Sequence, residues 1–487
     1  MLNSACLPRR RAAMATALVL AAIAPGRAVA APGIVDGRSH RLAGTHSFSF
    51  SPSGAGGTVQ WTVDRETVTD VGVLTRTNGV LSGSGSNVSF SLPAVTACET
   101  IYYIRASDAG ASDVDTVQVF PSNTKTWFTY RSAGNPDVRV YCVIPSSLSS
   151  STRVVMAMHG NSRTASNYCD DWKAWGTQHN TIILCPYYDL VNWPTTGHYQ
   201  MGNVFSADDC EGVKNPEARW TFTIDEGIHA RVRDGFLLAN QRFDLWGFSG
   251  GGQHVHRFMI FKPNAKVRVA ITAGSGWYTA PDLGIDCPYG LHDPKLSFTQ
   301  QDLLKWTGKD MIIMVGSADT VRDADLRITP KAEAQGLNRY QRAGYMYAKG
   351  IAASPATHWK LIVVPGVDHD ASGMAQAAQA FLQGTTLDAP GPSAPGAQVS
   401  WQIQVSPNPV RAGSTLRGEG WSGSQVEVGL YDLAGRRVAS RAVSVSDGRW
   451  QLSWAAWVRP GTIAKGVYLV RARDGERRAQ QKLLVLE

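Results

Sequence analysis

Ser249 lies in a short glycine-rich segment whose residue types could carry nucleophilic chemistry. The segment GFSGG runs from Gly247 to Gly251, follows an apolar run that ends at Trp246, and precedes a helical pattern. A serine at a sharp strand-to-helix turn exposes its Oγ, and so tight a turn favours glycine at the flanking positions. This context predicts that Ser249 is a nucleophile rather than part of a structural Gly-Ser turn.

A serine hydroxyl is a weak nucleophile without a general base, and two later segments could supply a base and its orienting carboxylate. His369 follows the apolar run LIVVPG, and Asp319 follows the run MIIMVG. The chain order is serine, then acid, then histidine. We therefore expect His369 to take the proton of Ser249 and Asp319 to hold the imidazole tautomer. Asp323 is a second candidate for the acid.

The tetrahedral intermediate of acyl transfer needs two N–H donors. The Gly250 N–H directly follows the nucleophile, and Asn161 follows the apolar run RVVMAM in the segment HGN. These two backbone groups are the predicted oxyanion hole. Trp277 and Tyr278, in the segment GSGWYT, are predicted to form an aromatic wall for an acyl or aryl group. Core packing is the alternative for both rings.

Residues 123–386 have the pattern of a parallel α/β domain. Apolar runs such as RVVMAM, TIILCPYY, FDLWGF, VRVAITA, MIIMVG and KLIVV alternate with helical patterns such as GQHVHRFMIFK and MAQAAQAFLQG. Near-continuous apolar strands indicate a sheet that is covered on both faces. Active sites of such sheets form at the carboxyl ends of the strands, where the candidate residues above all lie.

Four segments of this domain carry a family resemblance: the HGN loop at 159–161, GFSGGG at 247–252, GSAD at 316–319 and PGVDHD at 365–370. Together they resemble α/β-hydrolase esterases, close to secreted poly(3-hydroxybutyrate) depolymerase-like and feruloyl esterase-like enzymes. The resemblance implies a mostly parallel sheet with helices on both faces. It also implies hydrolysis of carboxylic esters through an acyl-enzyme on Ser249, with no metal or organic cofactor. Polyesters and aryl-ester polymers are both open as substrates.

Two small all-β modules are predicted on either side of the α/β domain. Residues 40–122 contain short alternating runs separated by turn residues and resemble an immunoglobulin-like or cadherin-like sandwich. Residues 387–400 form a Pro/Gly/Ser/Ala linker. Residues 401–487 contain SPNP, YDLAGRRV and GVYLV in that order and resemble the C-terminal sorting domain of type IX secretion. That resemblance implies the type IX machinery as a partner, and a further attachment sandwich is the alternative.

The N-terminus predicts export. Residues 1–30 contain three consecutive arginines, then an apolar run and a small-residue Ala-Val-Ala site, the pattern of a cleaved secretory signal peptide. The apolar run is too short to span a bilayer comfortably, so no transmembrane segment is expected. The mature chain is therefore predicted to be secreted, with surface attachment as a further possibility from the C-terminal module.

The cysteine count fits an oxidising compartment. Of seven cysteines, Cys6 falls in the signal peptide, and six remain. The predicted pairs are Cys210 with Cys287 and Cys169 with Cys185, which leaves Cys98 and Cys142. No C-x-x-C spacing occurs, and His254 and His256 are two apart on a predicted helix, where they face different ways; no metal site is expected.

The charge pattern argues against nucleic acid as a partner. The net charge is +8, and residues 401–487 contain 13 Lys and Arg against 7 Asp and Glu, but the basic residues are dispersed along alternating strands. Two other functions stay open. A serine peptidase or amidase would use the same triad on the same fold, and a surface adhesin could retain the fold without catalysis.

Overall fold

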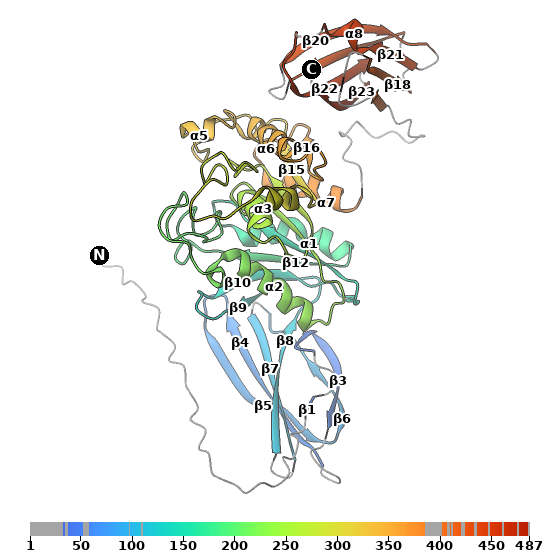
Figure 1. Cartoon of the computed structure of the whole chain (residues 1–487). Helices are drawn as coiled ribbons and strands as arrows, with labels where there is room; N and C mark the ends of the chain where they lie inside the picture. Colours follow the sequence, from blue (N-terminus) through green and yellow to red (C-terminus); the bar gives the residue numbers. More distant parts are fainter. Residues whose placement is uncertain are drawn as a thin grey trace, which may run out of the picture.

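The computed structural model describes residues 33–34, 38–51, 58–96, 98–108, 111–384, 402–406, 410, 413–419, 424–432, 436–446, 449–459, 462–474 and 477–485. The predicted signal peptide and linker lie outside these residues. A β module, a large α/β domain and a second β module follow one another along the chain (Figure 1). Among the described helices, none is long and apolar enough to cross a membrane.

The α/β domain is built on one eight-stranded sheet. Its strands in spatial order are β16 (Lys360–Val364), β15 (Met311–Gly316), β14 (Val267–Ala273), β13 (Phe243–Phe248), β11 (Arg153–Met158), β12 (Thr181–Tyr187), β10 (Val138–Val143) and β9 (Lys125–Tyr130). The six strands from β11 to β16 pair in parallel, whereas β10 is antiparallel to both of its neighbours. The predicted α/β fold with a mostly parallel sheet is confirmed.

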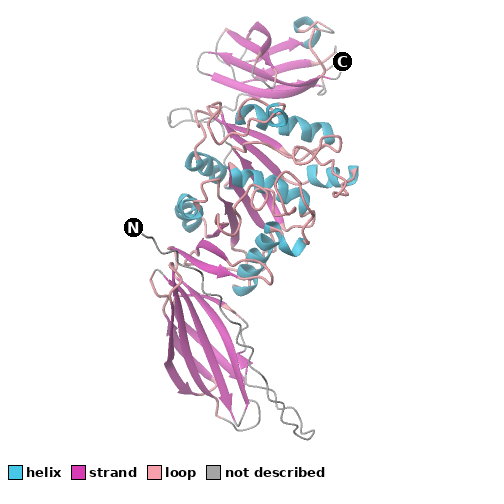
Figure 2. Ribbon diagram, turned by 90° about the vertical axis from the view of Figure 1, so that its left-hand side faces the viewer, coloured by secondary structure: helices cyan, strands magenta, loops and turns pink. Residues whose placement is uncertain are grey.

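Helices cover both faces of this sheet, as Figure 2 shows. One hydrophobic cluster joins the sheet to α1 (Ala165–Gln178) and α7 (Ala371–Leu382), with Trp172 and Trp246 fully buried in it. A second cluster covers the other face, where the helices are α2 (Thr221–Gly235), α3 (Gly250–Phe261), α4 (Gln300–Thr307) and α6 (Arg339–Ala353). The short helices η1 (Glu217–Arg219) and α5 (Pro330–Glu333) lie in connecting loops. Burial on both faces explains why the central strands read as continuous apolar runs.

The strand order reverses its direction between β11 and β13. The chain passes from β11 to β12 on one side and later returns to β13 on the other, with Met158 of β11 level with Gly247 of β13. Loops that leave adjacent strands in opposite directions open a crevice at their carboxyl ends. The segment with Asn161 leaves β11 at this point, and the segment with Ser249 leaves β13 beside it.

The N-terminal module is a sandwich of two sheets. The larger sheet has the order β2 (His40–Leu42), β8 (Ala111–Phe120), β7 (Cys98–Asp108), β4 (Gln60–Thr69) and β5 (Leu74–Ser84). The smaller sheet consists of β1 (Gly33–Ile34), β3 (Gly44–Ser51) and β6 (Asn87–Leu92). Phe48 and Phe90 stack with ring centroids 4.5 Å apart in the core between the sheets. The sandwich agrees with the predicted all-β module, and its immunoglobulin-like classification stays a prediction.

A buried polar contact joins this module to the α/β domain. The carboxylate of Glu99, which is 1% exposed, accepts hydrogen bonds from the Thr129 N–H at 3.0 Å and the Thr129 hydroxyl at 2.9 Å. Arg231 of α2 donates to the Gln118 side chain at 2.8 Å and to the Thr129 carbonyl at 3.0 Å. Because these groups are buried and satisfied, they fix the orientation of the module on the domain.

The C-terminal module is a second sandwich. Its sheets have the orders β17 (Gln402–Ser406), β18 (Thr415–Glu419), β21 (Arg449–Ser453), and β20 (Arg437–Ser444), β19 (Gln425–Tyr431), β22 (Gly466–Asp474), β23 (Arg477–Val485). A short helix, α8 (Trp454–Trp457), follows β21. Alternating residues such as Val426, Val428 and Leu430 point into a core shared by both sheets. The module is a β-sandwich as predicted, with α8 as a short addition, and its sorting role stays a prediction.

One of the two predicted disulfides is present. Cys210 and Cys287 are bonded, as expected. The prediction of a Cys169–Cys185 bond is wrong, because both residues are free thiols buried between α1 and the sheet. Burial raises the pKa of the Cys185 thiol well above its ordinary value, which disfavours the thiolate needed for disulfide formation. Cys98 and Cys142 are also free.

Candidate active site

Ser249 occupies the strained turn that its sequence context predicts. Its backbone has φ 55° and ψ −116°, a left-handed conformation that is rare for a residue with a side chain. A Cβ on Gly247 would overlap the Gly251 backbone, and a Cβ on Gly251 would overlap the Met158 carbonyl. The glycines therefore allow β13, α3 and β11 to approach closely. The Ser249 N–H donates to the Ala273 carbonyl at 2.9 Å and ties the turn to β14.

The three predicted triad residues meet in one hydrogen-bonded chain. His369 Nε2 lies 3.1 Å from Ser249 Oγ, and His369 Nδ1 lies 2.8 Å from Asp319 Oδ2. A carboxylate can only accept, so Nδ1 carries the proton and Nε2 is free to accept from the serine hydroxyl. The His369 side chain is 24% exposed and packs against the Phe248 ring, whereas the Asp319 side chain is 1% exposed. The predicted base is thus partly exposed, whereas the predicted orienting acid is buried.

The contacts of Arg339 distinguish the two candidate acids, Asp319 and Asp323. Its guanidinium holds Asp323 with two hydrogen bonds of 2.5 and 2.9 Å, and these bonds lower the pKa of the Asp323 carboxyl. The same guanidinium lies 3.7 Å from Asp319 Oδ1. Asp323 is therefore the counterion of a buried arginine, and Asp319 alone contacts His369. Asp370, the neighbour of His369, caps the N-terminus of α7 by accepting from the Gly373 N–H at 2.7 Å.

The predicted oxyanion donors are neighbours. A Cβ built on Gly250 would lie 3.2 Å from the Asn161 nitrogen, so the two backbone N–H groups lie beside Ser249. Neither N–H donates to another group in the part of the chain that the structure describes. His159, two residues before Asn161, fixes the loop, because its Nε2 accepts from the Tyr188 N–H at 3.1 Å. Burial lowers the pKa of His159 to about 3, so this imidazole is neutral and structural.

Comparison with known proteins agrees with this geometry. No family model matches the sequence, and no curated protein matches it. Among solved structures, poly(aspartic acid) hydrolase-1 from Sphingomonas sp. KT-1 is 30% identical, with a TM-score of 0.51; the match covers 54% of this chain and 99% of the other. The poly(3-hydroxybutyrate) depolymerase LpqC from Bordetella parapertussis is 27% identical, with a TM-score of 0.51; the match covers 55% of this chain and 92% of the other. The chain is a serine ester hydrolase of the α/β-hydrolase fold.

The two aromatic residues predicted to line the pocket of this hydrolase are buried. Trp277 is 3% exposed and stacks under the guanidinium of Arg257, with Arg327 on the ring as well, at 4.0 and 4.9 Å from the centroid. Tyr278 is fully buried beside His256, with its N–H bonded to the Gln335 side chain at 2.8 Å. These contacts give both rings a packing role, and contact with substrate stays a prediction.

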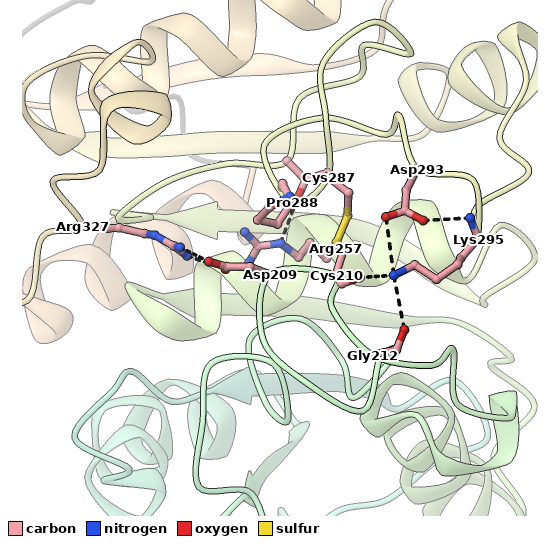
Figure 3. Close-up of a disulfide and its surroundings, with 10 residues drawn as sticks. Asp209, Cys210, Gly212, Arg257, Cys287, Pro288, Asp293, Lys295 and Arg327 are labelled. Carbon is pink, nitrogen blue, oxygen red and sulfur yellow. Dashed lines mark hydrogen bonds and ion pairs between the residues drawn. A yellow bond between two sulfur atoms is a disulfide. The ribbon is translucent and has the colours of Figure 1, made fainter.

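A disulfide joins the loops of the hydrolase that follow β12 and β14, and an ion pair beside it joins the first of these loops to the segment after β15 (Figure 3). Arg327 forms a two-bond ion pair with Asp209, next to the Cys210–Cys287 bond. Lys295 donates to the Cys210 carbonyl at 2.5 Å. These ties add to the backbone hydrogen bonds within the two loops, such as those from the Ser206 N–H to the Val213 carbonyl and from the Ala280 N–H to the Tyr289 carbonyl.

Sequence reasoning missed a second histidine–carboxylate pair in the hydrolase. His254 Nε2 lies 2.7 Å from Asp225 Oδ2, and both side chains are fully buried. The Tyr188 hydroxyl donates to the other oxygen of Asp225 at 2.6 Å. His256, two residues along α3, instead accepts from the Thr279 N–H at 3.0 Å, so the two histidines do face different ways. Neither Asp225 nor Tyr188 lies in a recognisable motif.

Proposed function

We propose that the hydrolase is a secreted enzyme that cleaves ester bonds in an apolar polymer through an acyl-enzyme on Ser249. The observation that carries the catalytic part is the hydrogen-bonded chain from Ser249 through His369 to Asp319, with two unused N–H groups beside the serine. Such a chain makes a hydroxyl nucleophilic at neutral pH, because it gives the proton a base that is held in the accepting tautomer.

The reaction follows from this geometry. His369 Nε2 takes the hydroxyl proton as Ser249 Oγ bonds to the ester carbonyl carbon, and the carbonyl π electrons move to oxygen. The Asn161 and Gly250 N–H groups stabilise that oxyanion. When the intermediate collapses, the ester C–O bond breaks and the alkoxide leaves with the proton of His369. Water then attacks the acyl-enzyme, with His369 again as base, and releases the carboxylic acid. No step requires a metal or organic cofactor.

The polymeric substrate is supported by where exposed apolar side chains lie. Val191, which is 88% exposed, follows β12 at the carboxyl edge of the sheet, and Val321 and Ile328 follow β15 at the same edge. Val71, which is 81% exposed, lies in the β4–β5 turn of the N-terminal module. The neighbouring Asp70 carbonyl in that turn accepts from Arg139, which is level with the last residue of β12. Apolar side chains around a catalytic edge suit an apolar surface better than a dissolved polar ester.

A serine amidase is the second candidate. One of the two structural neighbours is named for poly(aspartic acid), a polymer whose monomers are joined by amide bonds. The same triad would serve amide cleavage, with His369 protonating the leaving amine. Trp277 and Tyr278 are proposed as the wall that selects the acyl group in either case.

The test is a substrate panel on the full chain. We expect turnover of p-nitrophenyl butyrate and release of soluble acid from a poly(3-hydroxybutyrate) film, with little cleavage of aminoacyl p-nitroanilides. Variants with Val71→Ser and Val191→Ser should lose film hydrolysis and keep p-nitrophenyl butyrate hydrolysis. Val114→Ser, at an exposed position of β8, is the matched control. Cleavage of anilides but not of esters would replace the esterase proposal with the amidase.

Export by the type IX pathway is proposed from the C-terminal sequence motifs. A chain that ends near residue 388 should hydrolyse p-nitrophenyl butyrate at the rate of the full chain, because its triad is intact. In a host that has the type IX pathway, this shortened chain should accumulate in the periplasm. Its normal appearance in the medium would rule out the sorting role of residues 401–487.

A further inference from the structure

Gln200 lies beside the predicted oxyanion donors, although nothing in its sequence context indicates a role. It belongs to the long loop between β12 and η1 and is 4% exposed. Its Nε2 donates to Asn161 Oδ1. A Cβ built on Gly250 would lie 3.1 Å from that Nε2 and 2.9 Å from Asn161 Oδ1. The two side-chain amides and the Gly250 backbone therefore meet at one point.

The loop segment that carries Gln200 is itself held by α3. Arg257 Nη1 donates to the Gln200 carbonyl at 3.2 Å, and His254 Nδ1 lies 2.9 Å from the Tyr199 carbonyl. Arg257 and His254 are one turn apart on the helix that begins at Gly250. The helix α3, which begins next to Ser249, thus also binds two consecutive backbone carbonyls of the loop, those of Tyr199 and Gln200.

His254 is held by hydrogen bonds at both of its ring nitrogens. One ring nitrogen faces the Tyr199 carbonyl and the other faces the Asp225 carboxylate, and both partners can only accept. Both ring nitrogens are therefore engaged by buried oxygen atoms. Such a contact is costly to break, because removing one partner leaves the other buried without a hydrogen bond.

We propose that Gln200 is a positioning residue that fixes Asn161 for oxyanion binding, and that α3 holds Gln200 in place through His254 and Arg257. This inference rests on the proposed acyl-enzyme function. Gln200 restrains the Asn161 side chain, and through it the direction of the Asn161 N–H. An oxyanion donor is effective only when it is oriented before the charge develops.

The expected effect of Gln200→Leu is a loss in kcat with little change in KM. Removal of an oxyanion donor costs about 10²-fold to 10³-fold in kcat, so loss of its orientation should cost about 10-fold to 100-fold. Gln200→Glu should cost more, because a carboxylate would stand beside the developing oxyanion. Gln118→Leu is the matched control: Gln118 is also a buried glutamine, but it bonds Glu99 and Arg231 at the module interface.

The deciding experiment is a double-mutant cycle on the full chain with two readouts, kcat on p-nitrophenyl butyrate and the rate constant of fluorophosphonate labelling. Gln200→Leu should lower both in the wild-type background and should have little further effect on an Asn161→Ala background. Unfolding temperatures above the assay temperature for all variants would exclude a purely structural loss.

Equal losses from Gln200→Leu in both backgrounds would overturn the positioning role, as would a rise in KM at constant kcat. A wild-type chain that neither turns over the ester nor reacts with the fluorophosphonate would overturn the acyl-enzyme function itself, and the inference with it. A wild-type chain that reacts at the same rate as Gln200→Leu would overturn the inference alone.

Discussion

Two histidine–carboxylate pairs of this hydrolase contain a buried carboxylate, and they differ in what faces the second ring nitrogen. In the pair His369–Asp319, at 2.8 Å, the second nitrogen faces the Ser249 hydroxyl, and the imidazole is 24% exposed. In the pair His254–Asp225, at 2.7 Å, the second nitrogen faces the Tyr199 carbonyl, and neither side chain is exposed.

The difference teaches that a histidine–carboxylate pair is not by itself a catalytic site. A hydroxyl can give its proton to a ring nitrogen, whereas a carbonyl can only receive a hydrogen bond. His369 therefore keeps an empty acceptor position for the reaction, and His254 has both positions filled. In the proposed mechanism the first pair moves a proton, whereas the second holds a loop.

The two histidine–carboxylate pairs are expected to differ most in their effect on kcat. Ser249→Ala or His369→Ala should lower kcat on p-nitrophenyl butyrate by about 10⁴-fold to 10⁶-fold, because the nucleophile or its base is removed. The unfolding temperature should stay near the wild-type value, since His369 is partly exposed. Steady-state kinetics and circular dichroism check the two expectations. Retention of even a tenth of the activity in His369→Ala would break the comparison.

The next contrast separates the two carboxylates near His369. Asp319→Asn should lower kcat by about 10⁴-fold, because an amide in place of the carboxylate favours the wrong imidazole tautomer. Asp323→Asn should cost much less in kcat, since Asp323 contacts Arg339 and not the imidazole. Near-full activity in Asp319→Asn together with an inactive Asp323→Asn would reverse the assignment of the acid.

The contribution of the His254–Asp225 pair is expected in the free energy of unfolding. Asp225→Ala leaves His254 Nε2 and the Tyr188 hydroxyl buried without this partner, and each unsatisfied buried group costs about 1–3 kcal/mol of the free energy of unfolding. Urea denaturation of wild type and variant measures this loss. Asp319→Asn, which keeps the size and one acceptor of its side chain, is the comparison variant. An unchanged urea midpoint for Asp225→Ala would contradict the structural role of the His254–Asp225 pair.

Buried histidines that have no carboxylate partner extend the comparison to the pH dependence of stability. Burial lowers the pKa of His40, at the junction of β2 with α2, from 6.5 to about 4. The folded chain therefore keeps this ring neutral while the unfolded chain protonates it, so stability is full above pH 6.5 and is lost as pH falls toward 4. The loss should reach about 2 kcal/mol at pH 5. His40→Leu should reduce this pH dependence of urea unfolding.

The absence of histidine beyond residue 369 provides an internal control for that measurement. The C-terminal module has no imidazole to protonate, so a histidine effect on its unfolding between pH 7 and pH 5 is not expected. A shift in its transition as large as that of the α/β domain would show that groups other than buried histidines cause the acid sensitivity.

Local sequence context was sufficient for part of the site. Ser249 was predictable because its glycines are required by close backbone contacts, and those contacts leave a short motif after a strand. His369 was predictable because it follows the last strand of the sheet. The alternation of apolar runs and helical patterns likewise predicted the parallel sheet, since both faces of that sheet are buried.

Other features depend on contacts between distant segments, which leave no local pattern. Asp319 and Asp323 follow the same strand, and the choice between them is made by Arg339, which enters from a later helix. Gln200 lies in a long loop without hydrophobic periodicity, and Asp225 lies in the helix α2 that comes after this loop. The wrong Cys169–Cys185 pairing has the same origin, because cysteine parity does not reveal an apolar environment that keeps thiols reduced.

The most direct test of the account is fluorophosphonate labelling followed by peptide mass spectrometry on the full chain. The account predicts one adduct, on the peptide that contains Ser249, and a loss of esterase activity in proportion to labelling. His369→Ala should not be labelled at a measurable rate, whereas His254→Gln should still be labelled wherever it remains folded. An adduct on another serine, or labelling of His369→Ala at the wild-type rate, would contradict the assignment of Ser249 and His369. No labelling of the folded wild-type chain would instead favour a non-catalytic adhesin.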